Sequence, residues 1–196
     1  MKKRLLTSLC IGLSSMSFSE LELGKTTMDI YGHVMLDMAF QAKQNNPNWY
    51  DVMRPSQLPV YENQYGADGN FSASVRQTRL GFKTATPLGD EEIKTIFEFE
   101  LFGTGPDAGQ TTFRLRHAYG EYKNFGAGQY WSVFMDPDVF PDSLEYWGPS
   151  GMIFYRNIQF RYMPVKTEEN SVAISLEKPG ASGDPGVLAN DESLTG

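Results

Sequence analysis

The side chains best placed to do chemistry in this sequence are two glutamates, Glu98 and Glu100, separated by a single residue. On an extended strand both would lie on one face, about 6–7 Å apart, a spacing that could suit the two carboxyl groups of a glycosidase. Arg114 and Arg116 follow in the next extended segment, and guanidinium groups beside the pair would keep both carboxylates ionised. Such a pair would lack a general acid, so the sequence indicates a protein that is not an enzyme.

Neither the histidines nor the start of the chain adds a catalytic motif. His33 and His117 are far apart, and His117 follows the apolar alternation of its segment, which predicts a position at a subunit contact or in an aromatic girdle. Residues 24–26 (GKT) have the ending of a phosphate-binding loop, but Ser19 stands where the first glycine of that motif belongs. We therefore expect no cofactor and no dedicated metal site.

The first residues have the pattern of a secretory signal peptide. A basic stretch at residues 2–4 precedes the uncharged segment 5–18, and Ser17 and Ser19 are small residues just before Glu20. A basic head, an apolar middle and a small-x-small exit are typical of a cleaved leader, and this middle is too short and serine-rich for a membrane-spanning helix. The sequence predicts a signal peptide over residues 1–19 and export.

The composition of the predicted mature chain, residues 20–196, argues against two classes of protein. The single cysteine, Cys10, lies in the leader, so the mature chain lacks the disulfide framework that a small secreted domain usually needs. The formal charge of −7 becomes −10 when the three basic residues leave with the leader, which argues against binding nucleic acid. No linker or repeat divides residues 20–196.

Long segments of alternating polarity make up most of the remaining chain. In residues 28–40 every even position is apolar or glycine, whereas Asp29, His33 and Asp37 share the other face. A run of this length fits a barrel-spanning strand of about 9–11 residues better than a globular strand of about 5–6. Similar alternation predicts strands at 71–84, 92–102, 112–123, 125–133, 155–163 and 171–177.

The predicted connections alternate in length. The first and fifth, at 41–70 and 134–154, are long and the third, at 104–110, is modest, whereas the even-numbered ones at 87–90, near Asn124 and at 164–170 are short. Short periplasmic turns and longer outer loops are typical of outer membrane barrels, whereas a soluble β-sandwich usually has shorter strands and lacks this rhythm. The pattern predicts an all-β fold, a transmembrane antiparallel β-barrel of porin type, of which this chain supplies an incomplete N-terminal part of about seven strands.

The charged face of each strand would line the lumen, because an arginine or lysine on the lipid face costs about 2–4 kcal/mol at the midplane. Pairing about the expected turns places Arg79 opposite Glu98. The next turn places Glu98 opposite Arg116, and the same register sets Glu100 opposite Arg114. The residues predicted to line the pore are the basic Arg79, Lys83, Arg114, Arg116 and Arg161 and the acidic Glu98 and Glu100. Neutralisation of the wall by salt bridges is the alternative role for these arginines.

The fifth connection, residues 134–154, has the opposite charge. It contains no basic residue, and its acidic residues are Asp136, Asp138, Asp142 and Glu145. Inside the pore it would narrow the lumen and face the arginines, so that the two charge signs set up a transverse field. An outward, solvated loop is the alternative. Asp136 and Asp138 could bind Ca²⁺ weakly, although nothing in the sequence requires it.

Several of these segments resemble known porins. Residues 78–83 (TRLGFK), 113–119 (FRLRHAY) and 125–129 (FGAGQ) resemble strands of general bacterial porins, and residues 28–164 resemble the DcaP-like trimeric porins. The resemblance implies a closed barrel of about 16 strands, a homotrimer in outer membrane lipid, and an outer loop, here 134–154, folded into the pore. It also implies a link to dicarboxylate uptake. Because the chain supplies about seven strands and ends in a polar stretch, we expect it to be truncated.

The function that these observations predict is passive diffusion of small polar solutes through a bacterial outer membrane porin, with anions such as dicarboxylates among them. Two alternatives stay open at this point. One is a non-conducting outer membrane surface protein, an adhesin or scaffold. The other is a soluble secreted β-sandwich that binds a ligand. The residues do not identify the permeating solute or the ion selectivity.

Overall fold

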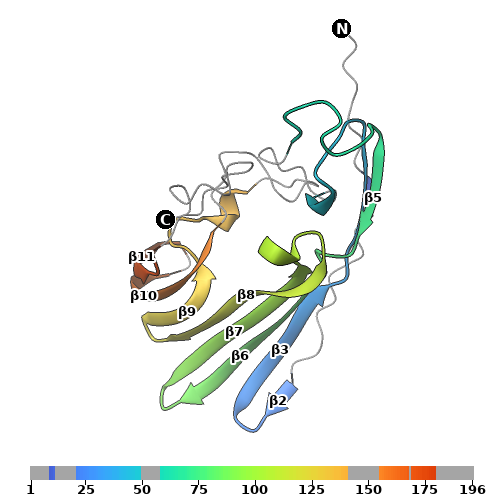
Figure 1. Cartoon of the computed structure of the whole chain (residues 1–196). Coiled ribbons are helices and arrows are strands. Elements are labelled where there is room, and N and C mark those ends of the chain that lie inside the picture. Colours follow the sequence, from blue (N-terminus) through green and yellow to red (C-terminus); the bar gives the residue numbers. More distant parts are fainter. Residues whose placement is uncertain (1–8, 12–20, 50–57, 141–154, 168, 180–196) are drawn as a thin grey trace.

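The computed structural model describes residues 9–11, 21–49, 58–140, 155–167 and 169–179, and these form an all-β structure (Figure 1). The strands are β1 (Leu9–Ile11), β2 (Leu21–Leu23), β3 (Thr26–His33), β4 (Leu36–Gln41), β5 (Asn70–Ser74), β6 (Arg79–Leu88), β7 (Glu91–Phe102), β8 (Thr111–Tyr122), β9 (Phe125–Trp131), β10 (Arg156–Lys166) and β11 (Ser171–Glu177). Short 3₁₀ helices lie in the connections: η1 (Pro47–Trp49), η3 (Gly105–Asp107) and η4 (Pro137–Val139). Among the described residues no helix has the length and apolar character needed to cross a membrane.

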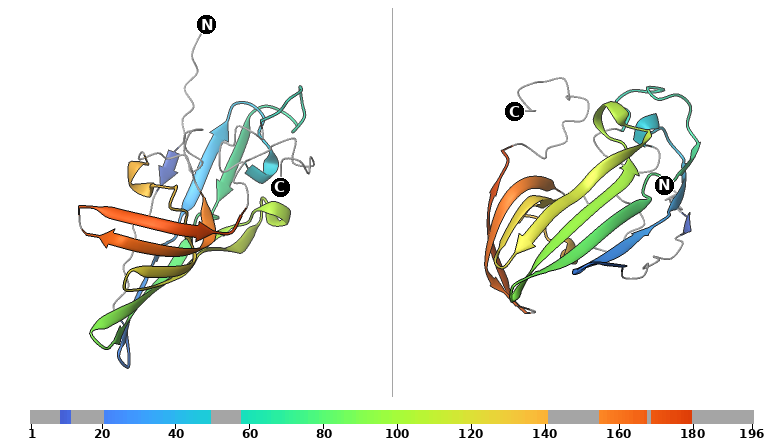
Figure 2. Two further views of the ribbon diagram at one scale, coloured as in Figure 1. Left: turned by 90° about the vertical axis from the view of Figure 1, so that its left-hand side faces the viewer. Right: turned by 90° about the horizontal axis from the view of Figure 1, so that it is seen from below.

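The main sheet is an antiparallel meander. Its strand order is β11-β10-β9-β8-β7-β6-β3-β2, so that most strands pair with their neighbours in the chain. The described strands curve like part of a barrel wall and leave the wall open, with β2 and β11 at its two edges (Figure 2). This architecture confirms the predicted fold class, a porin-type β-barrel of which the chain contributes an N-terminal part.

The two faces of the sheet have opposite character. Cross-strand partners share a face, and the row containing Phe82 and its partner Phe97 lies outside, where Phe97 is 47% exposed. Other large apolar side chains are exposed too, including Phe113, Ile158, Phe160, Ile174 and Leu176. The opposite, concave face holds buried polar side chains, including Glu98, Glu100 and Gln159. A soluble sandwich would cover its apolar face with a second sheet, whereas this apolar face is exposed, as a lipid-facing wall requires.

Two of the predicted strands, 28–40 and 71–84, are each divided in the structure. The first splits into β3 and β4 and the second into β5 and β6. β3 pairs with β6 in the main sheet, while β4 and β5 pair in a smaller sheet. Both breaks lie at the same level, because the Met35 amide donates to the Thr78 hydroxyl at 3.1 Å. The prediction of single strands was wrong because the alternation in residues 28–40 runs unbroken across the bend.

Tight turns and long connections lie at opposite ends of the sheet (Figure 1). Residues 89–90 and 123–124 each close a hairpin over two residues, with Leu88 paired to Glu91 and Tyr122 paired to Phe125. Gly89 has φ +66°, in the left-handed region that such short turns require. The connections between β4 and β5 and between β7 and β8 are longer. The predicted long–short rhythm is therefore confirmed for the described connections.

The N-terminal strands add two details. Residues 24–25, which have the ending of a phosphate-binding loop, form the hairpin turn between β3 and β2, a strand that the alternation did not predict. β1 pairs with β4, and it lies within the predicted signal peptide, so cleavage before Glu20 would remove it. Most of residues 1–19 lie outside the described residues, and the signal peptide stays a prediction.

Candidate functional site

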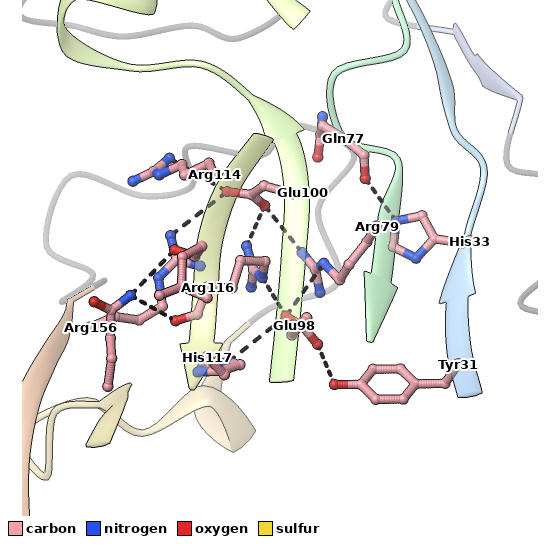
Figure 3. Close-up of polar contacts among 12 residues, drawn as sticks. Tyr31, His33, Gln77, Arg79, Glu98, Glu100, Arg114, Arg116, His117 and Arg156 are labelled. Atoms are coloured by element: carbon pink, nitrogen blue, oxygen red, sulfur yellow. Dashed lines mark hydrogen bonds and ion pairs between the residues drawn. The ribbon is translucent and has the colours of Figure 1, made fainter. Parts of the chain in front are cut away.

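Polar side chains from five strands gather on the concave face around the two glutamates of β7 (Figure 3). We call this group the ion cluster, and its members are Glu98, Glu100, Arg79, Arg114, Arg116 and Arg156. The arginines come from β6, β8 and β10, so the cluster ties together strands on both sides of β7. In this arrangement four guanidinium groups surround two carboxylates, which leaves positive charge in excess.

Glu98 uses both of its carboxylate oxygens. Oε2 accepts a hydrogen bond from the Tyr31 hydroxyl at 2.7 Å, and Oε1 accepts from Nε of Arg116. Nε of Arg79 lies 3.7 Å from the same Oε1. Two arginines from strands on either side therefore flank one carboxylate, which confirms the expectation from the sequence.

Glu100 is the centre of the cluster. Its carboxylate oxygens lie 3.5 Å from a guanidinium nitrogen of Arg114, 3.7 Å from one of Arg156 and 3.8 Å from one of Arg79. Nη1 of Arg116 donates a hydrogen bond to Oε2. The Glu100 side chain is only 1% exposed. A carboxylate buried this deeply is stable only because it has charged partners on several sides.

The register between β6 and β7 differs from the prediction. Arg79 pairs with Glu100, and Gly81 pairs with Glu98, because the turn is centred on residues 89–90. Placing the turn one residue earlier led to the expectation that Arg79 faces Glu98, which was wrong by two positions. The error keeps Arg79 on the correct face, and its long side chain still lies near both glutamates.

A β-bulge in β8 shapes the cluster. Glu100 pairs with Arg114 as predicted, but Glu98 pairs with His117 and not with Arg116, because the register shifts after Glu98. Arg116 is the extra residue of the bulge, which lets its side chain turn towards both glutamates. The Gln129 side chain donates to the carbonyl oxygens of Leu115 at 3.3 Å and Arg116 at 3.1 Å, so it satisfies backbone acceptors at the irregularity.

The bulge also reverses the orientation of the residues that follow it. His117 was predicted on the apolar face, at a subunit contact or girdle, and this was wrong. It is 3% exposed on the inner face, and its ring lies 4.7 Å from the rings of both Tyr130 and Trp131. Its Nε2 lies 3.8 Å from Oε1 of Glu98. Tyr119, two residues further along, is buried too. One inserted residue moves a whole strand segment to the other face.

The four arginines of the cluster differ in accessibility. The side chains of Arg116 and Arg156 are 3% and 6% exposed, whereas those of Arg79 and Arg114 are 24% and 32% exposed. Arg116 therefore serves chiefly to hold the two glutamates, which is the neutralising role left open by the sequence. Arg79 and Arg114 present guanidinium groups at the concave surface, where they can donate hydrogen bonds to an anion.

The other two predicted basic residues lie on the same face but outside the ion cluster. The Lys83 ammonium lies 4.9 Å from the centre of the Tyr31 ring. Arg161 donates to the Gln159 side chain at 3.0 Å and to the Trp131 carbonyl at 2.6 Å. These contacts fix Arg161 along the wall rather than against a carboxylate.

The predicted acidic loop is described only in part. Asp136 and Asp138 lie at η4, where the Asp138 amide donates to Oδ1 of Asp136 at 3.1 Å, and both side chains are exposed. Asp142 and Glu145 lie outside the described residues. Entry of residues 134–154 into the pore thus stays a prediction. Within the described ranges no three metal-ligating side chains gather at one place.

Two members of the site were missed at the sequence level. Tyr31 shares the polar face of Asp29 and His33, so the alternation could have indicated its inward position. Arg156 offers no such signal, since the alternation of β10 groups it with the outward-facing Ile158. It is the first residue of β10, and its guanidinium lies 5.1 Å from the Trp131 ring centre.

Comparison with known proteins assigns the family. Residues 13–184 match the sequence profile of the DcaP outer membrane protein family. Among solved structures, the outer membrane channel DcaP of Acinetobacter baumannii superposes with a TM-score of 0.67 at 23% sequence identity. The alignment covers 83% of this chain but 44% of that channel, so the present chain spans less than half of its length. No curated protein sequence matches. Since the family profile covers most of the chain, the chain belongs to the DcaP outer membrane protein family.

Proposed function

We propose that the complete protein is a porin that lets small anionic solutes, dicarboxylates among them, diffuse passively across the bacterial outer membrane. The observation that carries the proposal is the excess of guanidinium groups over carboxylates on the concave face. Arg79 and Arg114, which approach Glu100 from the strands on either side, are its accessible members. The similar solved structure is described as a channel, which supports the same function.

Fixed positive charge at a narrow aqueous passage raises the local concentration of anions and lowers that of cations. A dicarboxylate would gain twice, because each of its carboxylates can accept hydrogen bonds from one guanidinium group. Both glutamates are already engaged by arginines, so they neither repel such a solute strongly nor supply a general acid. Passage without catalysis is the function that this wall supports.

The outer surface supports a membrane location. Exposed aromatic and aliphatic side chains such as Phe97, Phe113 and Phe160 cover the convex face and would contact lipid or neighbouring subunits. Assembly as a homotrimer, the long connections facing outwards and a loop of residues 134–154 in the pore complete the proposal.

Ion selectivity of the complete protein in a planar bilayer tests the proposal. We expect a reversal potential in a salt gradient that indicates anion preference, and a shift towards cation preference in Arg79→Ser/Arg114→Ser. Arg116 is unsuitable for this test, because it is buried between the glutamates. Lys43→Ser is the matched control, since Lys43 is exposed and paired with Asp68 on the first connection. A double variant with an unchanged reversal potential would contradict the role of these arginines. A complete protein that conducts nothing would favour the non-conducting surface protein.

A further inference from the structure

Another buried arginine, Arg76, lies outside the ion cluster, in the break between β5 and β6. Nη1 of its guanidinium donates to the Asn48 carbonyl at 3.1 Å, and Nη2 donates to the Gly103 carbonyl at 2.8 Å. These two acceptors belong to different connections, the first and the third. Arg76 therefore joins two loops at the end of the sheet that carries the long connections.

The two loops share a small apolar core beneath this guanidinium. Trp49 and Phe102 are 5% and 0% exposed, their ring centres are 5.8 Å apart, and Ala108 packs against them. The Arg76 guanidinium lies 3.9 Å from the centre of the Phe102 ring, a cation–π contact. Among the described residues these rings form the buried apolar cluster of the chain.

Further contacts fix the first connection in place. The Asn45 side chain, 1% exposed, donates to the Trp49 carbonyl at 2.8 Å. The Gln44 side chain accepts from the Tyr65 amide at 3.2 Å, so the returning limb of the same connection is held as well. Gly109 lies directly against Asn48, since a Cβ atom at Gly109 would be 2.8 Å from the Asn48 Oδ1 atom. The two connections are in close contact, and a side chain at Gly109 would require Asn48 to shift.

This assembly lies over the inner wall. Phe102 follows Glu100 by two residues on β7, so its side chain is on the same face, about 6–7 Å nearer the end with the long connections. Figure 1 shows η1 and η3, the teal and lime coils, on the concave side at that end. In the proposed channel, with the long connections at its entrance, η1 and η3 lie beside the path of a solute from that end to Arg79 and Arg114.

We infer that residues 44–49 and 103–108 form a latch across the mouth of the pore, that Arg76 is its positioning residue, and that the latch limits the size of entering solutes. The inference rests on the proposed channel function and adds a size filter that is separate from charge selection. Arg76 acts by donating to backbone carbonyls and by packing on Phe102, and it does not contact the solute. Removing its donors leaves two carbonyls without a partner and frees the first connection to move.

Uptake of neutral sugars of increasing size into proteoliposomes containing the complete protein tests the inference, because neutral solutes do not respond to wall charge. We expect Arg76→Met to raise the uptake of large sugars relative to glucose. Arg76→Lys should raise it less, because the lysine ammonium keeps the positive charge but cannot reproduce the two guanidinium donors that reach separate carbonyls. Lys43→Met, an exposed basic residue on the same connection, should leave the ratio unchanged. An unchanged ratio in Arg76→Met, with the heat-modifiable gel mobility of a folded barrel retained, would overturn the latch.

Chymotrypsin cleavage at Trp49 in intact cells gives a readout that needs no channel activity. The buried Trp49 should resist cleavage in the wild type and in Lys43→Met, and become a cleavage site in Arg76→Met. Equal cleavage in all three proteins would refute the latch. If the wild type conducts no ions in the planar bilayer, the proposed channel function fails, while the cleavage pattern still decides whether Arg76 holds the two connections together.

Discussion

The ion cluster and the latch both bury arginine, but they satisfy it in different ways. In the cluster the partners are carboxylates, and the positive charge exceeds the negative charge. In the latch the partners of Arg76 include two backbone carbonyls and an aromatic ring. The Arg76 guanidinium holds the main chains of two loops, whereas the cluster places more guanidinium groups than carboxylates on the concave face. The comparison separates an arginine that joins two connections from arginines that we propose act on solutes.

The largest effect should come from the centre of the cluster. Glu100→Gln removes the charge that four arginines share, and breaking a buried ion pair in this way costs about 3–5 kcal/mol of the free energy of unfolding. Guanidinium unfolding of the complete protein in detergent would measure the loss. Glu121→Gln is the matched control on the next strand, because Glu121 is more exposed and pairs with Lys166, so its loss should be below about 1 kcal/mol. Equal losses in the two variants would remove the distinction between core and surface pairs.

An intermediate effect is expected in the latch. Arg76→Met removes the donor to the Asn48 and Gly103 carbonyls, of which the Gly103 hydrogen bond is buried, and an unsatisfied buried group costs about 1–3 kcal/mol in the free energy of unfolding. The reversal potential in a salt gradient should stay at the wild-type value, because Arg76 is buried. A shift as large as that of Arg79→Ser/Arg114→Ser would show that the charge of Arg76 faces the lumen, and the contrast between latch and cluster would be lost.

The smallest effect should appear at the bulge that aims Arg116. Gln129→Leu removes two hydrogen bonds to the Leu115 and Arg116 carbonyls, which are each longer than 3.0 Å, and should cost about 1 kcal/mol in the free energy of unfolding. Gln41→Leu at the end of β4, outside the bulge, is the comparison variant. A stability equal to the wild type would mean that water replaces the side chain at these carbonyls.

The wall could be predicted from the sequence because side-chain alternation reports directly which face a residue occupies. Glu98, Glu100, Arg79 and Arg114 were placed on one inner face, and the Glu100–Arg114 pair was obtained in the correct register. Their role in lining a pore stays a prediction. The position of Arg79 was wrong by two residues because the sequence of the turn permits more than one centre.

The bulge and the latch could not be predicted in the same way. A bulge adds one residue on one strand only. The side-chain pattern of β8 alone therefore cannot show where its residues change from one face of the sheet to the other, and His117 was misplaced for this reason. The latch consists of contacts between distant segments, such as Arg76 with Asn48 and Gly103, which leave no periodic signal. Arg156 was missed similarly, since its inward position depends on the packing of Trp131.

The unequal connections have a consequence for the order in which this sheet assembles. Closing a loop costs entropy that grows by about 0.6 kcal/mol for each doubling of its length. The hairpins β6–β7 and β8–β9 close over two-residue turns, whereas β4 and β5 meet only after residues 42–69 have been brought back. The local hairpins therefore have the entropic advantage early in folding, and the pairing of β3 with β6 forms later. The contacts between the first and third connections are then built last, on a wall that already carries its charges.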